Sequence, residues 1–413
     1  MLDLKNFYIE QIQDDFFPYW IKFIDNDYGG ILNCISNDGS NKLSDLKFTW
    51  SQGRWLWIMG RIHDMNKQGI FPKINNVQLE QWMEATYQFI TKYSIYGDNV
   101  CCFLLERDGQ KKVDNNTGCY DASIYADCFA LIGMAQYIKT MEKKENLPQV
   151  EALYSSIVRR IEDKEYRTEP YPVPPGYEVH GIPMILVNTI QEYVHMRQRL
   201  GLSSTDEIQY GMQKVQFILE ELYDGKYIRE HVSKFPESGE RLLDRHINPG
   251  HTFEDLWFLT EYLNEFGGLE KLLPHICKIA KNTFEIGWDN EYGGLLRFVD
   301  REGGKPHGKQ INTPYEQLIL DTWDMKLWWP HSEILYLFHL LYQITGDEMI
   351  KNMYDQSVDY IFRTFPNQEI GEWIQIRRRD GTPEEKVVAL PVKDPFHIMR
   401  NFLKIIELDS ISK

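Results

Sequence analysis

Apolar residues recur at helical spacing from one end of the chain to the other. Apolar positions at i, i+3, i+4 and i+7 predict amphipathic helices. The predicted helices follow one another in pairs, joined by links rich in Gly, Pro, Asn and Asp. About a dozen helices are predicted in this way, over residues 4–24, 52–65, 77–95, 121–142, 147–163, 183–199, 205–223, 251–266, 268–285, 328–345, 347–364 and 396–408.

Strand signals are short and lie between the predicted helices. Strands and helices do not alternate along the chain, which argues against a doubly wound parallel sheet. Residues 294–299, 373–376 and 386–390 have the composition of strands. We expect these segments to form short β-hairpins that protrude from a helical body.

One local signature occurs more than once. The string Asp-Asn-Asp-Tyr-Gly-Gly at 25–30 returns as Asp-Asn-Glu-Tyr-Gly-Gly at 289–294, and 366–373 is a looser third copy. Such self-similarity is typical of an array of helical hairpins. Paired helices without a domain linker predict one all-α domain over residues 1–413, an (α/α)6 barrel in which six hairpins form a toroid. A straight solenoid of hairpins is the alternative.

Composition narrows the classes of partner. The 413 residues include 61 acidic and 45 basic side chains, for a net charge of −16. This balance argues against binding to nucleic acid or to an anionic membrane, because both rely on a basic surface. The 11 Trp and 24 Tyr favour a carbohydrate ligand, because flat amphipathic rings pack well against sugars.

The cysteines and the start of the chain bear on the compartment. The first residues lack the basic segment and apolar run of a signal peptide, and no stretch approaches 18 uninterrupted apolar residues. The six Cys show no CxxC spacing. We therefore expect a cytoplasmic protein with reduced thiols.

The clearest candidate site follows the Asn-Pro-Gly turn at 248–250. A helical pattern begins at once, so His251 is expected at or just before a helix N-terminus, with Glu254 on the same face. A base beside a carboxylate at the mouth of a helix suits proton transfer on a small molecule. A helix cap in which Glu254 has a capping role is the alternative.

His397 occupies a similar position, after the Lys-Asp-Pro-Phe string at 393–396 and at the start of an apolar helix. In a toroid, equivalent positions of separate hairpins converge on the central cavity. His251 and His397 could then face one substrate carbon from opposite sides. Removal of a proton from one face and its return to the other is the chemistry of epimerisation.

The string Trp-Trp-Pro-His-Ser-Glu at 328–333 also opens a predicted helix. Paired Trp at this position can stack on the apolar face of a sugar, and Glu333 can accept hydrogen bonds from hydroxyl groups. Core packing is the alternative for the Trp pair. His331 fits a structural role better than a catalytic one.

Two further polar residues lie on predicted inner helices. Arg54, near a helix start, can polarise a carbonyl or an enediolate oxygen, and a surface helix cap is its alternative. Asn188 lies within an apolar helix and must find a hydrogen-bond partner, so a sugar hydroxyl and a core group are equally open.

Five strings together resemble the N-acylglucosamine 2-epimerase family, which also contains cellobiose 2-epimerases and mannose isomerases. They are Asn-Pro-Gly-His-x-x-Glu, Lys-Leu-Trp-Trp-Pro-His-Ser-Glu, Pro-Met-x-Leu-x-Asn, Gly-Glu-Trp and Phe-His-x-x-Arg. Each string alone is weak, and the combination is specific. The resemblance extends from about residue 45 to the C-terminus, and it implies an (α/α)6 barrel.

The resemblance also implies roles for individual residues. The positions that match the family's functional residues are Arg54, His251, Glu254, Glu333 and His397, with Trp329 and Trp373 as sugar platforms. Asn188 is the match for the polar position of its helix, whereas His180 has no assigned counterpart. The Trp-Trp-Pro-His-Ser-Glu string is more similar to the N-acylglucosamine branch than to the cellobiose branch.

The sequence thus predicts an enzyme that interconverts N-acetylglucosamine and N-acetylmannosamine. One His would remove the C2 proton of the open-chain sugar, Arg54 would stabilise the oxyanion, and the other His would protonate the opposite face. A mannose isomerase or a disaccharide 2-epimerase of the same family is the nearest alternative. A glycoside hydrolase with two cavity carboxylates and a non-catalytic sugar-binding protein are more remote.

No metal is expected, because no metal-ligand spacing such as HExxH is present. Members of the N-acylglucosamine branch can be activated by a nucleotide such as ATP. The chain contains no P-loop, so a nucleotide would need a non-standard site. A homodimer is one assembly that the sequence allows.

Overall fold

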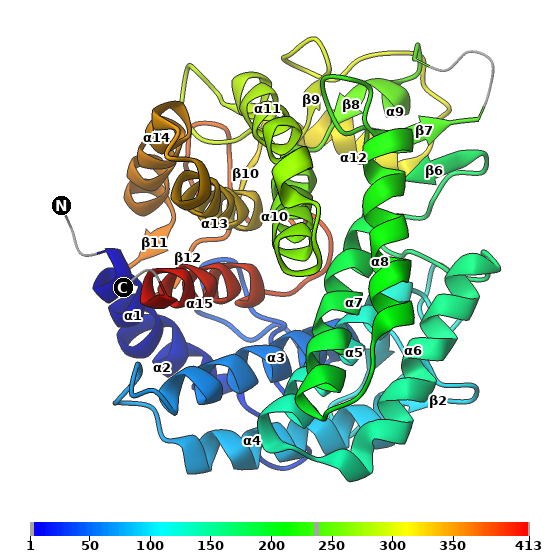
Figure 1. Cartoon of the computed structure of the whole chain (residues 1–413), viewed down its shortest axis with the longest axis vertical. Helices are drawn as coiled ribbons and strands as arrows, with labels where there is room; N and C mark the ends of the chain where they lie inside the picture. Colours follow the sequence, from blue (N-terminus) through cyan, green and yellow to red (C-terminus); the bar gives the residue numbers. More distant parts are fainter. Residues whose placement is uncertain (1–3, 235–238, 412–413) are drawn as a thin grey trace.

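The computed structural model describes residues 4–234 and 239–411, and helices dominate it (Figure 1). The α-helices are α1 (Leu4–Glu10), α2 (Phe17–Trp20), α3 (Thr49–Asn66), α4 (Asn76–Phe89), α5 (Ile124–Met141), α6 (Leu147–Glu162), α7 (Gly181–Arg199), α8 (Thr205–Phe217), α9 (Leu242–Arg245), α10 (Pro249–Phe266), α11 (Leu269–Gly287), α12 (Pro314–Thr322), α13 (Trp328–Thr345), α14 (Glu348–Thr364) and α15 (Phe396–Ile411). Short π- and 3-10 segments extend some of them, at Gln11–Phe16, Ile21–Phe23, Ile90–Ser94, Lys144–Asn146 and Ile218–Leu222.

The strands are two or three residues long and form antiparallel ladders between helices. They are β1 (Lys47–Phe48), β2 (Ile95–Tyr96), β3 (Val100–Cys101), β4 (Leu104–Leu105), β5 (Lys111–Lys112), β6 (Tyr177–Val179), β7 (His231–Ser233), β8 (His246–Ile247), β9 (Val299–Asp300), β10 (Lys326–Leu327), β11 (Pro366–Asn367), β12 (Glu372–Trp373) and β13 (Ile376–Arg377). One sheet has three strands in the order β1-β4-β5, and the other ladders are pairs.

Six inner helices form a closed ring. In order around the ring they are α3, α5, α7, α10, α13 and α15, and α15 packs back against α3. An outer helix covers each of the first five, namely α4, α6, α8, α11 and α14, while the N-terminal segment with α1 covers α15 (Figure 1). This arrangement confirms the predicted (α/α)6 toroid. The contact between α15 and α3 excludes the straight solenoid.

The predicted helices match the observed ones closely, and the differences have physical causes. The sequence reading missed α12, although Thr313 and Glu316 form a capping box at its start, which is a recognisable helix signal. The predicted strand at 386–390 is wrong, because no strand forms there. That segment instead contributes Val388, Ala389 and Leu390 to the wall of the cavity described below, which accounts for its apolar composition.

The repeated signature has a structural role at the starts of three inner helices. In each copy a buried carboxylate pairs with a buried Lys. This Lys lies shortly before the start of α3, α13 or α15. The three pairs are Asp25 with Lys47 at 2.8 Å, Asp289 with Lys326 at 3.0 Å, and Glu372 with Lys393 at 2.5 Å. Because each pair is buried, the loss of one partner would leave an uncompensated charge and destabilise the helix start.

The apolar faces of the helices are turned into one large core. The largest hydrophobic cluster contains residues of all six inner helices and of the helices outside them. All six cysteines are free thiols. Among the described residues, no helix is both long and apolar enough to cross a membrane.

Glycines set the close approach of α3 and α5. A Cβ on Gly53 would lie 2.1 Å from the carbonyl oxygen of Phe129, and a Cβ on Gly133 would lie 2.2 Å from the carbonyl oxygen of Gly53. The two backbones therefore touch where only hydrogen fits. This contact brings Arg54, the next residue of α3, over the ring of Phe129, with the guanidinium carbon 3.9 Å from the ring centroid.

Replacement of Gly53 by Ala should force the two backbones apart. We expect the free energy of unfolding to fall by about 1–3 kcal/mol, as for other overpacked cores, measured by chemical denaturation. Gly60→Ala, on the same helix, is the matched comparison, because its Cβ would meet the side chain of Gln136 rather than backbone, and it should therefore cost less stability. Equal losses in the two variants would contradict this account of the packing.

Candidate active site

A cavity of about 240 Å³ lies at the end of the ring where the inner helices begin. Every inner helix contributes residues of its first two turns to the wall, including Arg54, Phe129, Ile185, His251, Trp329 and His397. The six helix N-termini thus converge on one space. Their dipoles favour negative charge there, which suits a reaction that develops an oxyanion.

His251 is the third residue of α10. Pro249 opens the helix, and the side chain of Asn248 caps it by accepting a hydrogen bond from the backbone N–H of His251 at 3.3 Å. The imidazole lines the cavity, and its Nδ1 lies 2.8 Å from Oε1 of Glu230. If Nδ1 carries the proton, it donates to this carboxylate and Nε2 is left as the free base.

Glu230 comes from the chain just before β7, and the sequence reading missed it. Burial opposes its ionisation, but His251 and His180 more than offset burial and hold the pKa of Glu230 well below its usual range. A buried carboxylate on Nδ1 fixes both the orientation and the tautomer of a histidine. No pattern in the surrounding sequence marked Glu230 for this role.

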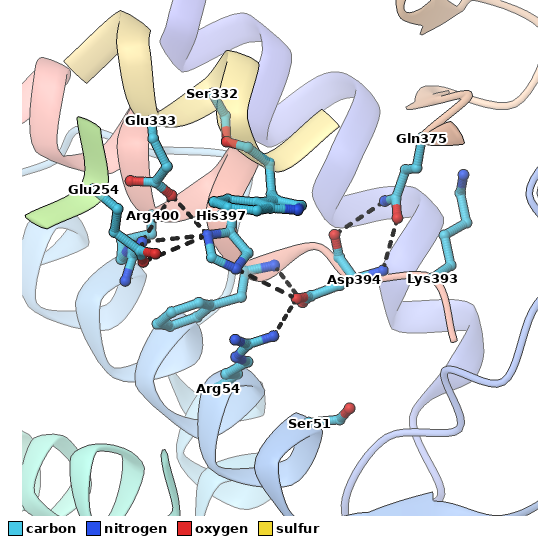
Figure 2. A network of polar contacts seen from close by, with 12 residues as sticks. Ser51, Arg54, Glu254, Ser332, Glu333, Gln375, Lys393, Asp394, His397 and Arg400 are labelled. Carbon is cyan, nitrogen blue, oxygen red and sulfur yellow. Dashed lines mark hydrogen bonds and ion pairs between the residues drawn. The ribbon is translucent and has the colours of Figure 1, made fainter. Parts of the chain in front are cut away.

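His397 is the second residue of α15 and is buried. Its Nδ1 lies 2.6 Å from Oε1 of Glu333 on α13 (Figure 2). Burial lowers the pKa of His397 to about 3, with Glu254 opposing that shift. The ring is therefore neutral at physiological pH and can act as a base.

The carboxylate of Glu333 is buried and hydrogen-bonded to protein groups. Its carboxylate accepts hydrogen bonds from Nε1 of Trp257 at 2.6 Å and from Arg400 at 2.7 Å, besides the contact with His397. It lies behind His397 and does not line the cavity. The prediction that Glu333 binds sugar hydroxyls is therefore corrected: its carboxylate contacts Nδ1 of His397 instead.

Arg400 completes this cluster, and one of its nitrogens lies 2.5 Å from Glu254 and 2.7 Å from Glu333 (Figure 2). Arg400 ends the Phe-His-x-x-Arg string, and its role was not predicted from the sequence. Glu254, Glu333 and His397 could together offer three metal-ligand atoms. The guanidinium already stands against both carboxylates, so these residues do not fit a metal ion.

Arg54 reaches the cavity from α3. It forms an ion pair of 2.5 Å with Asp394, whose carboxylate also accepts from the backbone N–H of Phe396 at the start of α15 (Figure 2). The same carboxylate is 4.0 Å from Nε2 of His397. Arg54 and Asp394 therefore lie beside one of the two histidines, on its cavity side.

Trp329 packs near both histidines. Its ring centroid is 5.3 Å from that of His251 and 5.6 Å from that of His397. A Cβ on Gly250 would lie 2.5 Å from the Trp329 indole, so this glycine lets the indole pack against the turn before His251. The two imidazoles thus line one cavity and both contact the same aromatic ring.

Other predicted residues lie away from the cavity. Trp373 is 1% exposed and packs against Phe365 and Phe402. The prediction of a sugar platform is wrong for this residue, because its ring lies in the core. Asn188 is buried within α7 and does not line the cavity, so the predicted contact with a sugar hydroxyl is not supported. His331 is structural: its Nε2 accepts from the backbone N–H of Leu295 at 2.8 Å.

The cavity wall also contains an arginine that the sequence reading missed. Arg297 is buried and donates to three neutral oxygens, those of the Thr322 and Tyr171 hydroxyls and the Val388 carbonyl. Among the described residues it has no carboxylate partner, unlike Arg54. Its guanidinium can therefore also donate to the oxygens of a ligand.

The family model described as N-acylglucosamine 2-epimerase matches residues 29–400. The N-acylglucosamine 2-epimerase of Bos taurus is 30% identical over 91% of this chain and 84% of its own length. The structure of cellobiose 2-epimerase from Bacillus thermoamylovorans B4167 superposes with a TM-score of 0.77 at 17% identity, covering 99% of this chain and 100% of the other. A D-mannose isomerase structure superposes with a TM-score of 0.75 at 13% identity, covering 99% of this chain and 98% of the other.

The chain has the (α/α)6 toroid fold that it shares with the cellobiose 2-epimerase and D-mannose isomerase structures. Within that fold class, the chain belongs to the N-acylglucosamine 2-epimerase family. The family predicted from the sequence is confirmed, and so is the enzyme class, a carbohydrate epimerase. The hydrolase and the non-catalytic alternatives are thereby set aside.

Trp329 and Trp373 should respond differently to truncation. Trp373→Ala should lower the free energy of unfolding by about 3–5 kcal/mol, because it empties part of the core. Trp329→Ala should cost clearly less stability and should instead raise KM, because the half-buried ring faces the cavity. Melting curves and saturation kinetics on both variants check this, and a normal KM in Trp329→Ala would contradict it.

Proposed function

We propose that the protein interconverts N-acetylglucosamine and N-acetylmannosamine by moving the C2 proton of the open-chain sugar between His251 and His397. One observation carries the proposal. Two imidazoles from different inner helices border the same indole, and each has Nδ1 against a buried carboxylate. This arrangement leaves both Nε2 atoms available for proton transfer to and from a substrate.

Proton removal comes first in this proposal. The carbonyl at C1 acidifies the C2 proton, and the neutral His397 takes it in one direction of the reaction. His251, whose side chain is 29% exposed, gives a proton to the opposite face and can exchange it with solvent. In the reverse direction the two residues change roles. Both transfers need the Nδ1 contacts, because these hold each ring in its tautomer.

Charge on the intermediate comes next. Loss of the C2 proton places negative charge on O1. Arg54 lines the cavity and pairs with Asp394, whose carboxylate is 4.0 Å from Nε2 of His397. The converging helix N-termini add fixed positive dipole ends. Groups that are oriented before the reaction stabilise such charge without reorganisation. Arg54 is therefore assigned to the oxyanion, and Glu254, which lines the cavity, to substrate orientation.

The size and lining of the cavity support a monosaccharide substrate. Its volume of about 240 Å³ is below the ordinary range of ligand pockets, roughly 300–1,000 Å³. Trp329 offers a flat ring and Arg297 offers donors to sugar oxygens. A disaccharide 2-epimerase is less well supported, because a second sugar would need more room. Activation by a nucleotide stays a prediction, and no step of this proposal uses it.

Single replacement of each histidine tests the two-base proposal. His251→Asn and His397→Asn should each lower epimerisation by at least about 10²–10⁴-fold in both directions, because each turnover needs both proton transfers. Each variant should still exchange the C2 hydrogen of one epimer, and the two variants should act on opposite epimers. Proton NMR in heavy water on each pure epimer measures both rates.

A near-normal epimerisation rate in either variant would refute the two-base proposal. Exchange from the same epimer in both variants would refute the assignment of opposite faces.

An aldose–ketose isomerase needs the same intermediate but returns the proton to C1. Incubation of the enzyme with N-acetylmannosamine and, separately, with mannose distinguishes the two outcomes. We expect N-acetylglucosamine from the first sugar and no comparable formation of fructose from the second. Faster formation of fructose would favour the isomerase.

A further inference from the structure

Each of the two histidines proposed as bases has a buried carboxylate against its Nδ1. The two sites differ in the residue that faces this carboxylate. Behind His397, the carboxylate of Glu333 is paired with the guanidinium of Arg400 at 2.7 Å. Behind His251, the carboxylate of Glu230 faces the ring of His180, with Nδ1 of His180 3.7 Å from Oε2 of Glu230. The imidazole of His180 thus faces Glu230 in the way that the guanidinium of Arg400 faces Glu333.

His180 is placed for this role by its backbone as well as by its ring. It directly precedes α7, and its N–H donates to the carbonyl oxygen of Glu230 at 3.0 Å. On its other side, Nε2 lies 3.0 Å from Oδ2 of Asp255. Asp255 is four residues after His251, so one face of α10 presents both residues. His180 and Glu230 thus bridge the first two turns of α10.

The surroundings favour a charged ring at this position. His180 is 1% exposed and does not line the cavity. The titratable groups that face it are Glu230, Asp255 and His251, together with Tyr125, whose hydroxyl lies against Gly181. Burial alone would favour the neutral ring, but Asp255 and Glu230 raise the pKa of His180 to about 9. Burial raises the pKa of Asp255, and His180 opposes that shift; an ionised carboxylate beside a neutral ring would lack a compensating charge.

We propose that His180 is a positioning residue for catalysis: its imidazolium, held between Asp255 and Glu230, keeps Glu230 ionised and pressed against Nδ1 of His251. The inference rests on the proposed two-histidine function. His180 touches no substrate and acts through Glu230. It serves only the His251 half of the reaction, whereas Arg400 serves the His397 half with a cation that does not lose its proton.

The test is His180→Gln, assayed by C2 hydrogen exchange from each pure epimer in heavy water. The epimer whose proton His251 removes is identified beforehand from the His251→Asn variant. Exchange from that epimer should fall about 10- to 100-fold, the usual effect of removing a group that orients a catalytic ligand. Exchange from the other epimer should stay within about threefold of wild type.

The pH profile supplies a readout that a purely structural role would not move. In the wild type, exchange through His251 should decline as the pH rises through about 9, where His180 loses its proton. This decline should be absent from His180→Gln. Asp255→Asn retains the shape of the side chain but removes one carboxylate, so it should shift the decline to lower pH; it also serves if His180→Gln does not fold.

His331→Gln is the matched control. His331 is likewise buried near the start of an inner helix, but its Nδ1 contacts only the carbonyl oxygen of Leu327, at 2.6 Å, and burial lowers its pKa to about 3. It should change stability without changing the ratio of the two exchange rates. Equal loss from both epimers in His180→Gln, or no loss from either, would overturn the inference. Normal behaviour of the His251 and His397 variants would instead overturn the proposed function itself.

Discussion

The contact of Arg400 with Glu254 and Glu333 is the interaction on which the rest of the site depends. The two carboxylates come from neighbouring inner helices, α10 and α13, and both are buried. Without a cation they would repel each other in a medium of low dielectric constant. Arg400 supplies that cation from α15, the helix that closes the ring. One guanidinium therefore joins three inner helices and fixes the carboxylate that orients His397.

Ring closure and catalysis are linked through the starts of the inner helices. Buried Lys–carboxylate pairs fix the chain before α3, α13 and α15, and those helices carry Arg54, Trp329 and His397 in their first two turns. A helix start is the natural place for such residues, because its dipole favours the negative charge of an oxyanion. The toroid brings six helix N-termini together, so that six helix dipoles act on one cavity instead of one.

His251 and His397 both have a carboxylate at Nδ1, but they differ in burial and in the groups around that carboxylate. His397 is buried behind a carboxylate with a permanent cation, which favours its neutral form. His251 is more exposed, and its supporting network contains a second, titratable histidine. In the proposed two-base reaction each ring must be neutral when it accepts the C2 proton and must carry that proton when it donates in the opposite direction. The difference in burial means that His251 is the ring that can exchange its proton more directly with solvent.

The sequence by itself determined the helices, their pairing and the residues that open them. His251, Arg54 and His397 were recognisable because turn residues and apolar periodicity are local signals, and the repeated Asp-Asn-x-Tyr-Gly-Gly string indicated the hairpin array. Only the tertiary structure decided which groups support them. Glu230, Asp394 and Arg400 contact residues of inner helices that lie elsewhere in the chain, up to 340 residues away, and no local pattern encodes such contacts.

The two tryptophans show the same division. Trp329 and Trp373 both lie in strings that resemble the family, yet one faces the cavity and the other lies in the core. An aromatic side chain suits a sugar platform and a core equally well, so composition cannot distinguish the two. The direction in which each ring points depends on the packing of α13 and of the β11–β12 hairpin against the ring. That packing exists only once the toroid has closed.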